Sequence, residues 1–167
     1  KIKVARLSQD LLSLDTPLTD CITVSQRWEN NWVEAPFVTK HGDHYYLMYS
    51  GSGYASRSYA VGYAVADSPT GSWTKYEHNP ILMENGFVSG PGHHSLIASP
   101  NGSELFIAYH THLTFAGGWQ RQLAMDRIIF DPSSSPPRVM IPTGPSYLPQ
   151  PIPSGAKPTK LAKSDEF

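Results

Sequence analysis

Residues 34–50, EAPFVTKHGDHYYLMYS, contain the pattern that decides the fold. Apolar and polar residues alternate on both sides of the HGD turn at residues 41–43, and such alternation around a short turn is typical of an antiparallel β-hairpin. A further alternating run, AVGYAVADS at residues 60–68, and the short run WTKY at residues 73–76 come next. We therefore predict a four-stranded antiparallel unit whose outermost strand is the WTKY segment.

The same unit recurs later in the chain. HHSLIASPNGSELFIAYH at residues 93–110 precedes QRQLAMDRIIFD at residues 120–131, just as the first hairpin precedes residues 60–68. At an offset of 60 residues, the matching pairs are Gly42 and Gly102, Tyr46 and Phe106, and Tyr49 and Tyr109. Four-stranded units that repeat at about 40 to 60 residues are typical of a β-propeller. The repeat therefore predicts an all-β propeller, with a β-sandwich as the alternative.

The repeat begins partway through a unit. Residues 2–10, IKVARLSQD, have the pattern of a third strand, but the two strands that should come first are not in the sequence before them. We therefore expect the chain to supply roughly the last half of the blades of a single propeller domain. The expected parts are the end of one blade with a connection at residues 1–27, the next blade at 28–90, the last blade present at 91–131, and an extended tail without new regular strands at 132–167.

Composition excludes some classes of function. The formal net charge is −1 and the pI is about 6.7, so we expect neither nucleic acid nor an anionic membrane as a partner. No apolar run approaches the roughly 20 residues that a membrane span needs. The single cysteine, Cys21, leaves the redox compartment open. The triplet Asn101-Gly-Ser is a glycosylation acceptor sequence, but an Asn-Gly pair between two apolar runs first of all predicts a hairpin turn.

Two segments at the predicted starts of inner strands carry candidate functional side chains. In WENNWVEAPF, residues 28–37, Glu34 lies among aromatic residues, and burial beside such rings in general raises the pKa of a carboxyl group toward the range of a general acid. A surface glutamate at a strand edge is the alternative. In SGPGHHS, residues 89–95, His93 and His94 must point to opposite sides of their strand, so one of them faces the channel. The alternative is that one of them is a hydrogen-bonded core residue.

Four motifs together resemble glycoside hydrolase family 43, which contains five-bladed β-propeller arabinofuranosidases, xylosidases and arabinanases. They are WVEAPFVTKHGDHYYLMYSGSGY, YAVGYAVADSPTGSW, SGPGHHSLI and RQLAMDRIIFD, in this order along the chain. The resemblance implies a five-bladed propeller that hydrolyses α-L-arabinofuranosyl or β-D-xylosyl linkages of plant cell-wall polysaccharide with inversion. It also implies a secreted, extracellular enzyme.

The resemblance assigns roles to individual residues. Glu34 in EAPF matches the general acid that protonates the leaving oxygen, and His93 in GPGHHS matches a histidine beside a calcium ion or linked to it through water. Arg121 matches an arginine that reaches the floor of the active site. Further expected substrate contacts are Trp28, Trp32 and Tyr54, from their position near the acid, and His94, which overlies Glu34 at the offset of 60 residues.

The chain departs from the family pattern in its aspartates. The resemblance implies a catalytic base and a second aspartate that tunes the acid, both in the first half of the propeller, and no aspartate of this chain stands in such a motif. We therefore expect a companion chain that carries the early blades and both aspartates. A non-catalytic carbohydrate-binding propeller fragment is the alternative. A weaker alternative is a zinc site drawn from the histidines His41, His44, His93, His94, His110 and His112.

Overall fold

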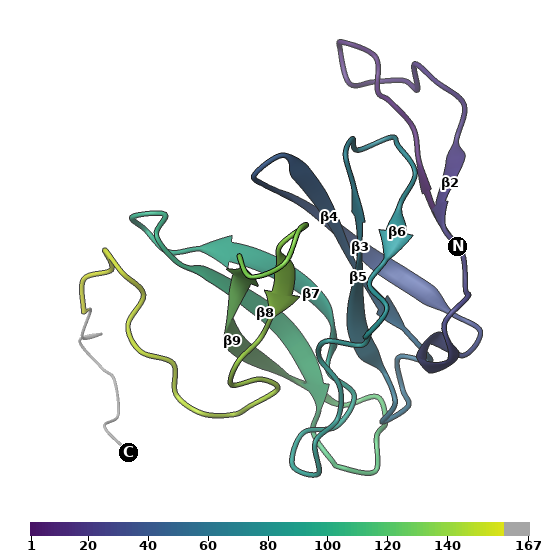
Figure 1. Ribbon diagram of the computed structural model, residues 1–167. Coiled ribbons are helices and arrows are strands. Elements are labelled where there is room, and N and C mark those ends of the chain that lie inside the picture. The colour runs from purple at the N-terminus through teal and green to yellow at the C-terminus, as the bar shows by residue number, and fades with distance from the viewer. Residues whose placement is uncertain (159–167) are drawn as a thin grey trace.

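Two four-stranded antiparallel sheets form the body of the protein, and they stack face to face like neighbouring blades (Figure 1). The computed structural model describes residues 1–158. The first sheet has the order β3-β4-β5-β6 and comprises β3 (Val33–His41), β4 (His44–Gly51), β5 (Ala60–Ala66) and β6 (Thr74–Lys75). Its strands lie where the alternating runs predict them, and β6 confirms the outer WTKY strand.

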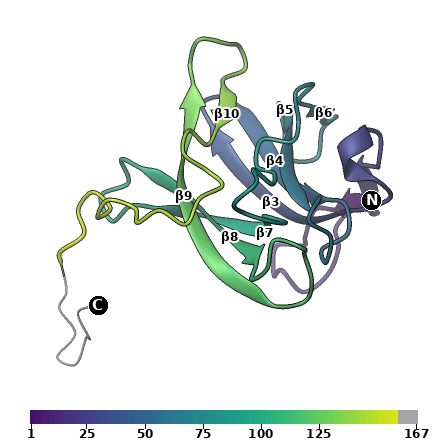
Figure 2. The ribbon, with the colours of Figure 1, turned by 90° about the horizontal axis from the view of Figure 1, so that it is seen from below.

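The second sheet has the order β10-β9-β8-β7. It comprises β7 (Gly92–Ala98), β8 (Leu105–His112), β9 (Arg121–Asp131) and β10 (Arg138–Met140). Figure 2 shows β10 beside β9, at the edge of the sheet that lies away from β7. The prediction of a tail without regular strands is therefore wrong at this point, because the tail turns back and supplies the outer strand. Residues 159–167, the end of the predicted tail, lie outside the described residues.

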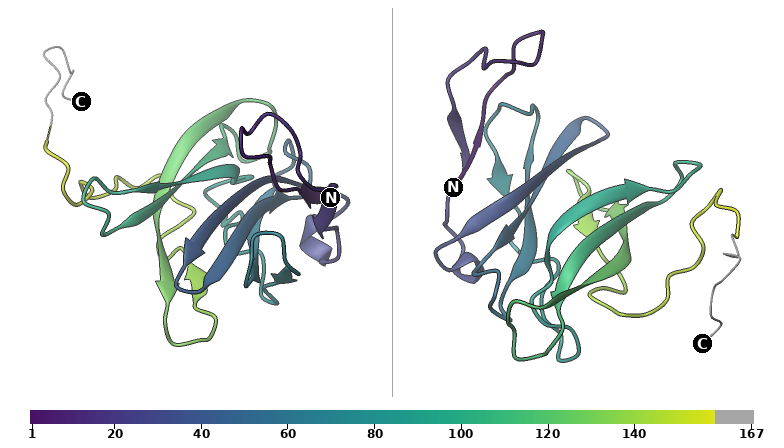
Figure 3. Two further views of the ribbon diagram at one scale, coloured as in Figure 1. Left: turned by 90° about the horizontal axis from the view of Figure 1, so that it is seen from above. Right: turned by 180° about the vertical axis from the view of Figure 1, so that it is seen from behind.

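A short hairpin precedes the first sheet. It pairs β1 (Ile2–Val4) with β2 (Thr19–Ile22) and projects away from the end at which the connections β6–β7 and β8–β9 lie (Figure 3). The strand predicted over residues 2–10 is thus much shorter than expected. The chain turns away after β1, where Arg6 pairs with Asp15 at 2.7 Å.

Most of the core lies between the two four-stranded sheets. Tyr46, Met48 and Tyr63 of the first sheet are buried against Ile107 and Tyr109 of the second. Burial of each such side chain stabilises the fold by roughly 1.5 to 3 kcal/mol. The opposite face of the first sheet packs on the β1–β2 hairpin through a smaller cluster that includes Leu47 and Ile22.

The two inner strands carry the same irregularity at corresponding places. In β3, Glu34 pairs with Ser50 and Phe37 with Met48, so the strand bulges by one residue. In β7, the same bulge lies between Gly92, which pairs with His110, and Ser95, which pairs with Ala108. The structural counterpart of Glu34 is therefore Gly92.

The predicted match between His94 and Glu34 is accordingly wrong, because it assumed an offset of 60 residues on the inner strands as well. The hairpin turn of the second sheet, between Ala98 and Leu105, is two residues longer than the turn between Lys40 and Tyr45. It contains Asn101 and confirms the predicted Asn-Gly turn.

The described residues contain one short helix, the 3-10 turn η1 (Arg27–Glu29), which joins the β1–β2 hairpin to β3. Within residues 1–158, no helix is long and apolar enough to cross a membrane.

Candidate active site

Glu34 lies at the start of β3 with its carboxyl group held by two donors. The Tyr59 hydroxyl donates to Oε1 at 2.7 Å, and the Trp32 indole Nε1–H donates to Oε2 at 2.8 Å. Tyr59 is fully buried, and this burial, together with the hydrogen bond to Glu34, raises the pKa of Tyr59. Tyr59 therefore stays protonated and remains a donor to the carboxyl group.

The Glu34 carboxyl group opens onto a pocket of about 370 Å³. Its lining residues are Asn30, Asn31, Trp32, Glu34, Gly53 and Tyr54. The Trp32 ring is 56% exposed even though its N–H is engaged, so much of its surface remains available to a ligand. A concave site with aromatic walls, amide side chains and one carboxyl group suits a sugar, which presents both C–H faces and hydroxyl groups.

Tyr59 packs against two paired residues of the second sheet, Gly92 and His110. An added Cβ at Gly92 would stand only 2.2 Å from Cε1 of Tyr59. The His110 ring stacks nearly parallel to the Tyr59 ring, with ring centroids 5.4 Å apart. Burial, and secondarily the Arg121 charge, lowers the pKa of His110 to about 4, so this imidazole is neutral near pH 7.

The bulges at the starts of the inner strands aim their side chains. Ala35 and His93 occupy equivalent positions, and both have positive φ angles, of 52° and 51°. Positive φ is uncommon for residues other than glycine and marks a locally imposed backbone geometry. In β3 this bulge follows Glu34 directly, so it sets the direction in which the carboxyl group leaves the strand.

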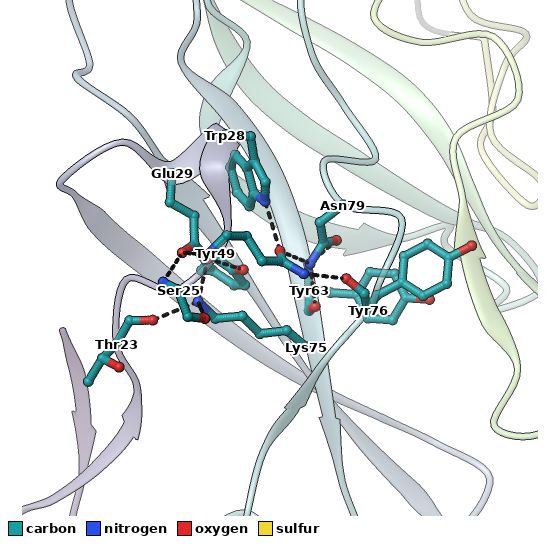
Figure 4. Close-up of polar contacts among 10 residues, drawn as sticks. Thr23, Ser25, Trp28, Glu29, Tyr49, Tyr63, Lys75, Tyr76 and Asn79 are labelled. Carbon is teal, nitrogen blue, oxygen red and sulfur yellow. Dashed lines mark hydrogen bonds and ion pairs between the residues drawn. The ribbon is translucent and has the colours of Figure 1, made fainter.

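The segment that leads into β3 is anchored by a buried acidic residue, Glu29 (Figure 4). Its carboxylate pairs with Lys75, accepts a hydrogen bond from Tyr49 at 2.7 Å, and accepts two more from the backbone N–H groups of Ser25 and Gln26. Its backbone carbonyl in turn accepts from the N–H of Trp32 at 3.0 Å. Glu29 thus fixes the stretch of backbone that carries the wall of the pocket. Sequence reasoning missed it, because a glutamate in a polar loop gives no sign of burial.

Trp28 does not line the Glu34 pocket, although the sequence analysis expected it to. Its indole packs over Gly51 and Gly62, where an added Cβ would meet the ring at 2.6 Å, and contacts Tyr49. It borders a separate pocket of about 620 Å³ together with Gln26 and other residues of the η1 and β6–β7 segments. Trp28 lies within η1, whereas Trp32 lies in the stretch between η1 and β3, and the two side chains line different pockets.

The two adjacent histidines of β7 differ in environment. The His94 side chain is buried beside Phe37, and both of its ring nitrogens lack a hydrogen-bond partner within residues 1–158. Burial lowers the pKa of His94 to about 4. His94 therefore does not reach the pocket surface, contrary to its predicted contact with substrate. His93 is exposed, and its backbone N–H donates to Ser50 Oγ.

The described part of the chain offers no complete metal site. Among residues 1–158, no three side chains of the His, Cys, Asp or Glu types converge. A calcium ion takes six to eight oxygen ligands, and a single exposed imidazole at His93 does not provide them. Of the histidines in the zinc alternative, His112 is engaged elsewhere, since both of its ring nitrogens contact protein atoms, Ser89 Oγ and the carbonyl of Tyr54.

Arg121 lies where β9 begins, with its guanidinium carbon 5.0 Å from the centroid of the Tyr54 ring. It therefore borders the Glu34 pocket across Tyr54. None of the residues that line this pocket is an aspartate. The buried aspartate of β9, Asp126, is instead engaged by Tyr109 and Ser146 and holds the chain after β10 in place.

A carboxyl group held at the start of an inner blade strand, beside a pocket with aromatic walls, suits a propeller protein that acts on carbohydrate. A family model described as glycosyl hydrolases family 43 matches residues 1–136. The chain therefore belongs to glycosyl hydrolase family 43.

Individual relatives agree with this. A thermostable family-43 glycoside hydrolase of known structure is 42% identical, with a TM-score of 0.84 over 92% of this chain. An endo-1,4-β-xylanase from Bacteroides thetaiotaomicron is 30% identical, with a TM-score of 0.75 over 83% of this chain. A β-D-galactofuranosidase from Aspergillus niger is 30% identical over 77% of this chain.

The chain spans only part of these relatives. It covers 50% of the thermostable hydrolase, 48% of the xylanase and 36% of the galactofuranosidase. The chain thus contains part of a family-43 β-propeller.

Proposed function

We propose that this chain carries the general-acid half of the active site of an inverting glycoside hydrolase. The substrate class is plant cell-wall polysaccharide with α-L-arabinofuranosyl or β-D-xylosyl linkages. Glu34 gives its proton to the glycosidic oxygen as the bond to the anomeric carbon breaks, and water takes the vacant position on the opposite face of the sugar. We place this activity outside the cell, because polymers of this size do not enter cells.

The geometry around Glu34 is the observation that carries the proposal. Tyr59 and Trp32 hold both carboxyl oxygens in fixed positions beside a pocket sized for a sugar unit. Inverting hydrolysis needs a second carboxylate about 6.5 to 9.5 Å from the acid to activate water. The residues that line the pocket contain no such partner. The base therefore comes from the remaining blades of the propeller, on the same polypeptide or on a companion chain.

The experiment uses the complete propeller with Glu34→Gln, which keeps the shape of the side chain and removes its acidic proton. We expect kcat on arabino- or xylo-oligosaccharides to fall by a factor of about 10² to 10⁴, the usual contribution of general acid catalysis. Glu77→Gln is a matched control, because Glu77 is exposed and lines the other pocket.

Unchanged turnover in the Glu34→Gln variant would contradict the proposal. If the unmodified propeller and its Glu34→Gln variant both bind the oligosaccharide but neither hydrolyses it, the alternative of a carbohydrate-binding propeller without hydrolytic activity would be supported instead.

A further inference from the structure

Trp119 lies in the β8–β9 connection and is 74% exposed, which is unusual for so large an apolar ring. It is not isolated on the surface. Its ring meets Tyr54 edge to face, with ring centroids 5.2 Å apart. Tyr54 also lines the Glu34 pocket. The exposed Trp119 ring is therefore continuous with the wall of the candidate active site.

The two connections that carry these rings are joined by hydrogen bonds. His112 Nε2 lies 2.9 Å from the carbonyl oxygen of Tyr54, and the Gly118 N–H donates to the carbonyl of Ala55 at 3.0 Å. The contact is close at Gly117 as well, where an added Cβ would stand 2.8 Å from the Ala55 carbonyl oxygen. Trp119 and Tyr54 are thus held in one arrangement before a ligand arrives, which lowers the entropic cost of binding.

Arg121 supplies the polar part of the same surface. Its guanidinium lies over the Tyr54 ring, and within residues 1–158 it forms neither an ion pair with a carboxylate nor a hydrogen bond. Its N–H donors are therefore available to hydroxyl oxygens of a ligand. Exposed aromatic rings beside free donors match a sugar, which stacks through its C–H face and accepts hydrogen bonds at its edge.

We propose that Trp119, Tyr54 and Arg121 form a second sugar subsite, which holds the unit on the leaving-group side of the bond that is cut. The proton of Glu34 goes to the oxygen between two sugar units, so both units must border Glu34. Tyr54 is the residue shared by the Glu34 pocket and the Trp119 surface, and it places the second unit next to the first. This inference rests on the proposed hydrolytic function.

The test compares two substrates in the complete propeller carrying Trp119→Ala. One substrate is an arabino- or xylo-oligosaccharide, whose leaving group is a sugar. The other is the matching glycosyl fluoride, whose leaving group is too small to reach Trp119. We expect kcat/KM to fall about tenfold on the oligosaccharide, the size expected for the loss of one aromatic contact, and to stay unchanged on the fluoride. Equal losses on both substrates, or no loss on either, would overturn the subsite.

Two controls sharpen this comparison. Trp119→Phe keeps a ring and should recover most of the loss. Tyr45→Ala removes a surface ring that also has a cation beside it, Lys40 Nζ at 5.5 Å from the ring centroid, but lies at the opposite end of β4. It should leave kcat/KM unchanged on both substrates.

A binding measurement separates failure of the subsite from failure of the proposed function. Oligosaccharide affinity is measured by calorimetry in the Glu34→Gln background, with and without Trp119→Ala. If the complete propeller hydrolyses neither substrate, the proposed function fails, but about tenfold weaker binding in the double variant would still support the subsite. Equal affinities would refute it.

Discussion

The hydroxyl of Tyr59 donates a 2.7 Å hydrogen bond to Oε1 of Glu34, although Glu34 lies on β3 and Tyr59 lies in the β4–β5 connection. Space for the Tyr59 ring exists because its neighbour on β7 is Gly92. Gly92 is also the structural counterpart of Glu34 in the next sheet. One blade therefore supplies the carboxyl group, and the same position of the next blade, without a side chain, makes room for the residue that holds it.

Tyr59→Phe should lower activity more than stability. The substitution removes one hydrogen bond, which costs about 1 kcal/mol of unfolding free energy. It also frees the Glu34 carboxyl group to rotate, so we expect kcat to fall about tenfold or more. Tyr46→Phe is the matched control, since the buried Tyr46 hydroxyl donates to the carbonyl of Pro137, away from the pocket. It should cost similar stability and leave kcat unchanged; equal effects of both variants on kcat would contradict a positioning role for Tyr59.

Gly92→Ala should destabilise the protein and disturb the site together. The new methyl group would overlap the Tyr59 ring, and overpacking of this kind typically costs about 1 to 3 kcal/mol. Thermal unfolding measures this loss, and kcat should fall with it because Tyr59 must move. Gly53→Ala is the control for stability, because an added Cβ there meets nothing within 4 Å. Equal melting temperatures of the Gly92→Ala and Gly53→Ala variants would contradict this prediction, because they would mean that β7 shifts away from the Tyr59 ring without loss of stability.

The buried Glu29–Lys75 pair should make stability depend on pH. Burial alone raises the pKa of Glu29, but the hydrogen bonds from Lys75, Tyr49 and the backbone outweigh it and hold the pKa below its usual 4.5. Because the folded state binds this proton more weakly, the stabilisation is fully present above about pH 4.5 and is lost as the pH falls through the folded-state pKa.

Denaturant unfolding between pH 7 and pH 3 measures this dependence. We expect Glu29→Gln to flatten the acid limb of the stability curve relative to the unmodified protein, and an unchanged limb would contradict the assignment. Lys75→Met leaves the Glu29 carboxylate buried without its cation, so at pH 7 it should cost about 3 to 5 kcal/mol. Lys40→Met is the control, because that surface cation lies beside Tyr45 and has no ion pair within residues 1–158.

Asp126→Asn should release the chain that follows β10. The Asp126 carboxylate accepts hydrogen bonds from five donors, which are Tyr109 Oη, Thr143 Oγ1, Ser146 N, Ser146 Oγ and Gln150 Nε2. An amide NH₂ at either oxygen position would face an N–H group that cannot accept, from Ser146 N at Oδ2 or Gln150 Nε2 at Oδ1. Each unsatisfied buried group costs about 1 to 3 kcal/mol. We expect faster proteolytic cleavage within residues 141–150. Asp67→Asn, on an exposed side chain, should cleave as the unmodified protein does.

The alternating runs and turn sequences were sufficient to predict most strands of both sheets. They depend on local chemistry, since the HGD and Asn-Gly turns and the period-two pattern act within a few residues. The predicted match between His94 and Glu34 failed because the hairpin turn of the second sheet is two residues longer than that of the first. The sequence alone does not show which residues of two strands pair, so this difference in turn length became visible only in the structure. Strand β10 was missed for a related reason, since a three-residue edge strand in a Pro-rich segment forms only by pairing with β9.

Among the site residues, Glu34 was singled out from its EAPF context, and Trp32 and Tyr54 from their nearness to it in sequence. The same reasoning misplaced Trp28, because sequence distance does not show which way η1 turns a side chain. It also overlooked Tyr59 and Trp119, which lie in the β4–β5 and β8–β9 connections and contact the pocket residues Glu34 and Tyr54. No local signal distinguishes these aromatic residues from the many others in the chain.

The sequence by itself determined the family and the antiparallel units and singled out Glu34 as the candidate acid, because motif, turn and alternation are properties of neighbouring residues. Only the tertiary structure decided which acids are buried and which aromatic rings surround Glu34. Burial of Glu29 and Asp126 depends on partners 46 residues away at Lys75 and 20 residues away at Ser146. A buried charge is tolerated only where such partners converge, and that convergence is set by the stacking of sheets.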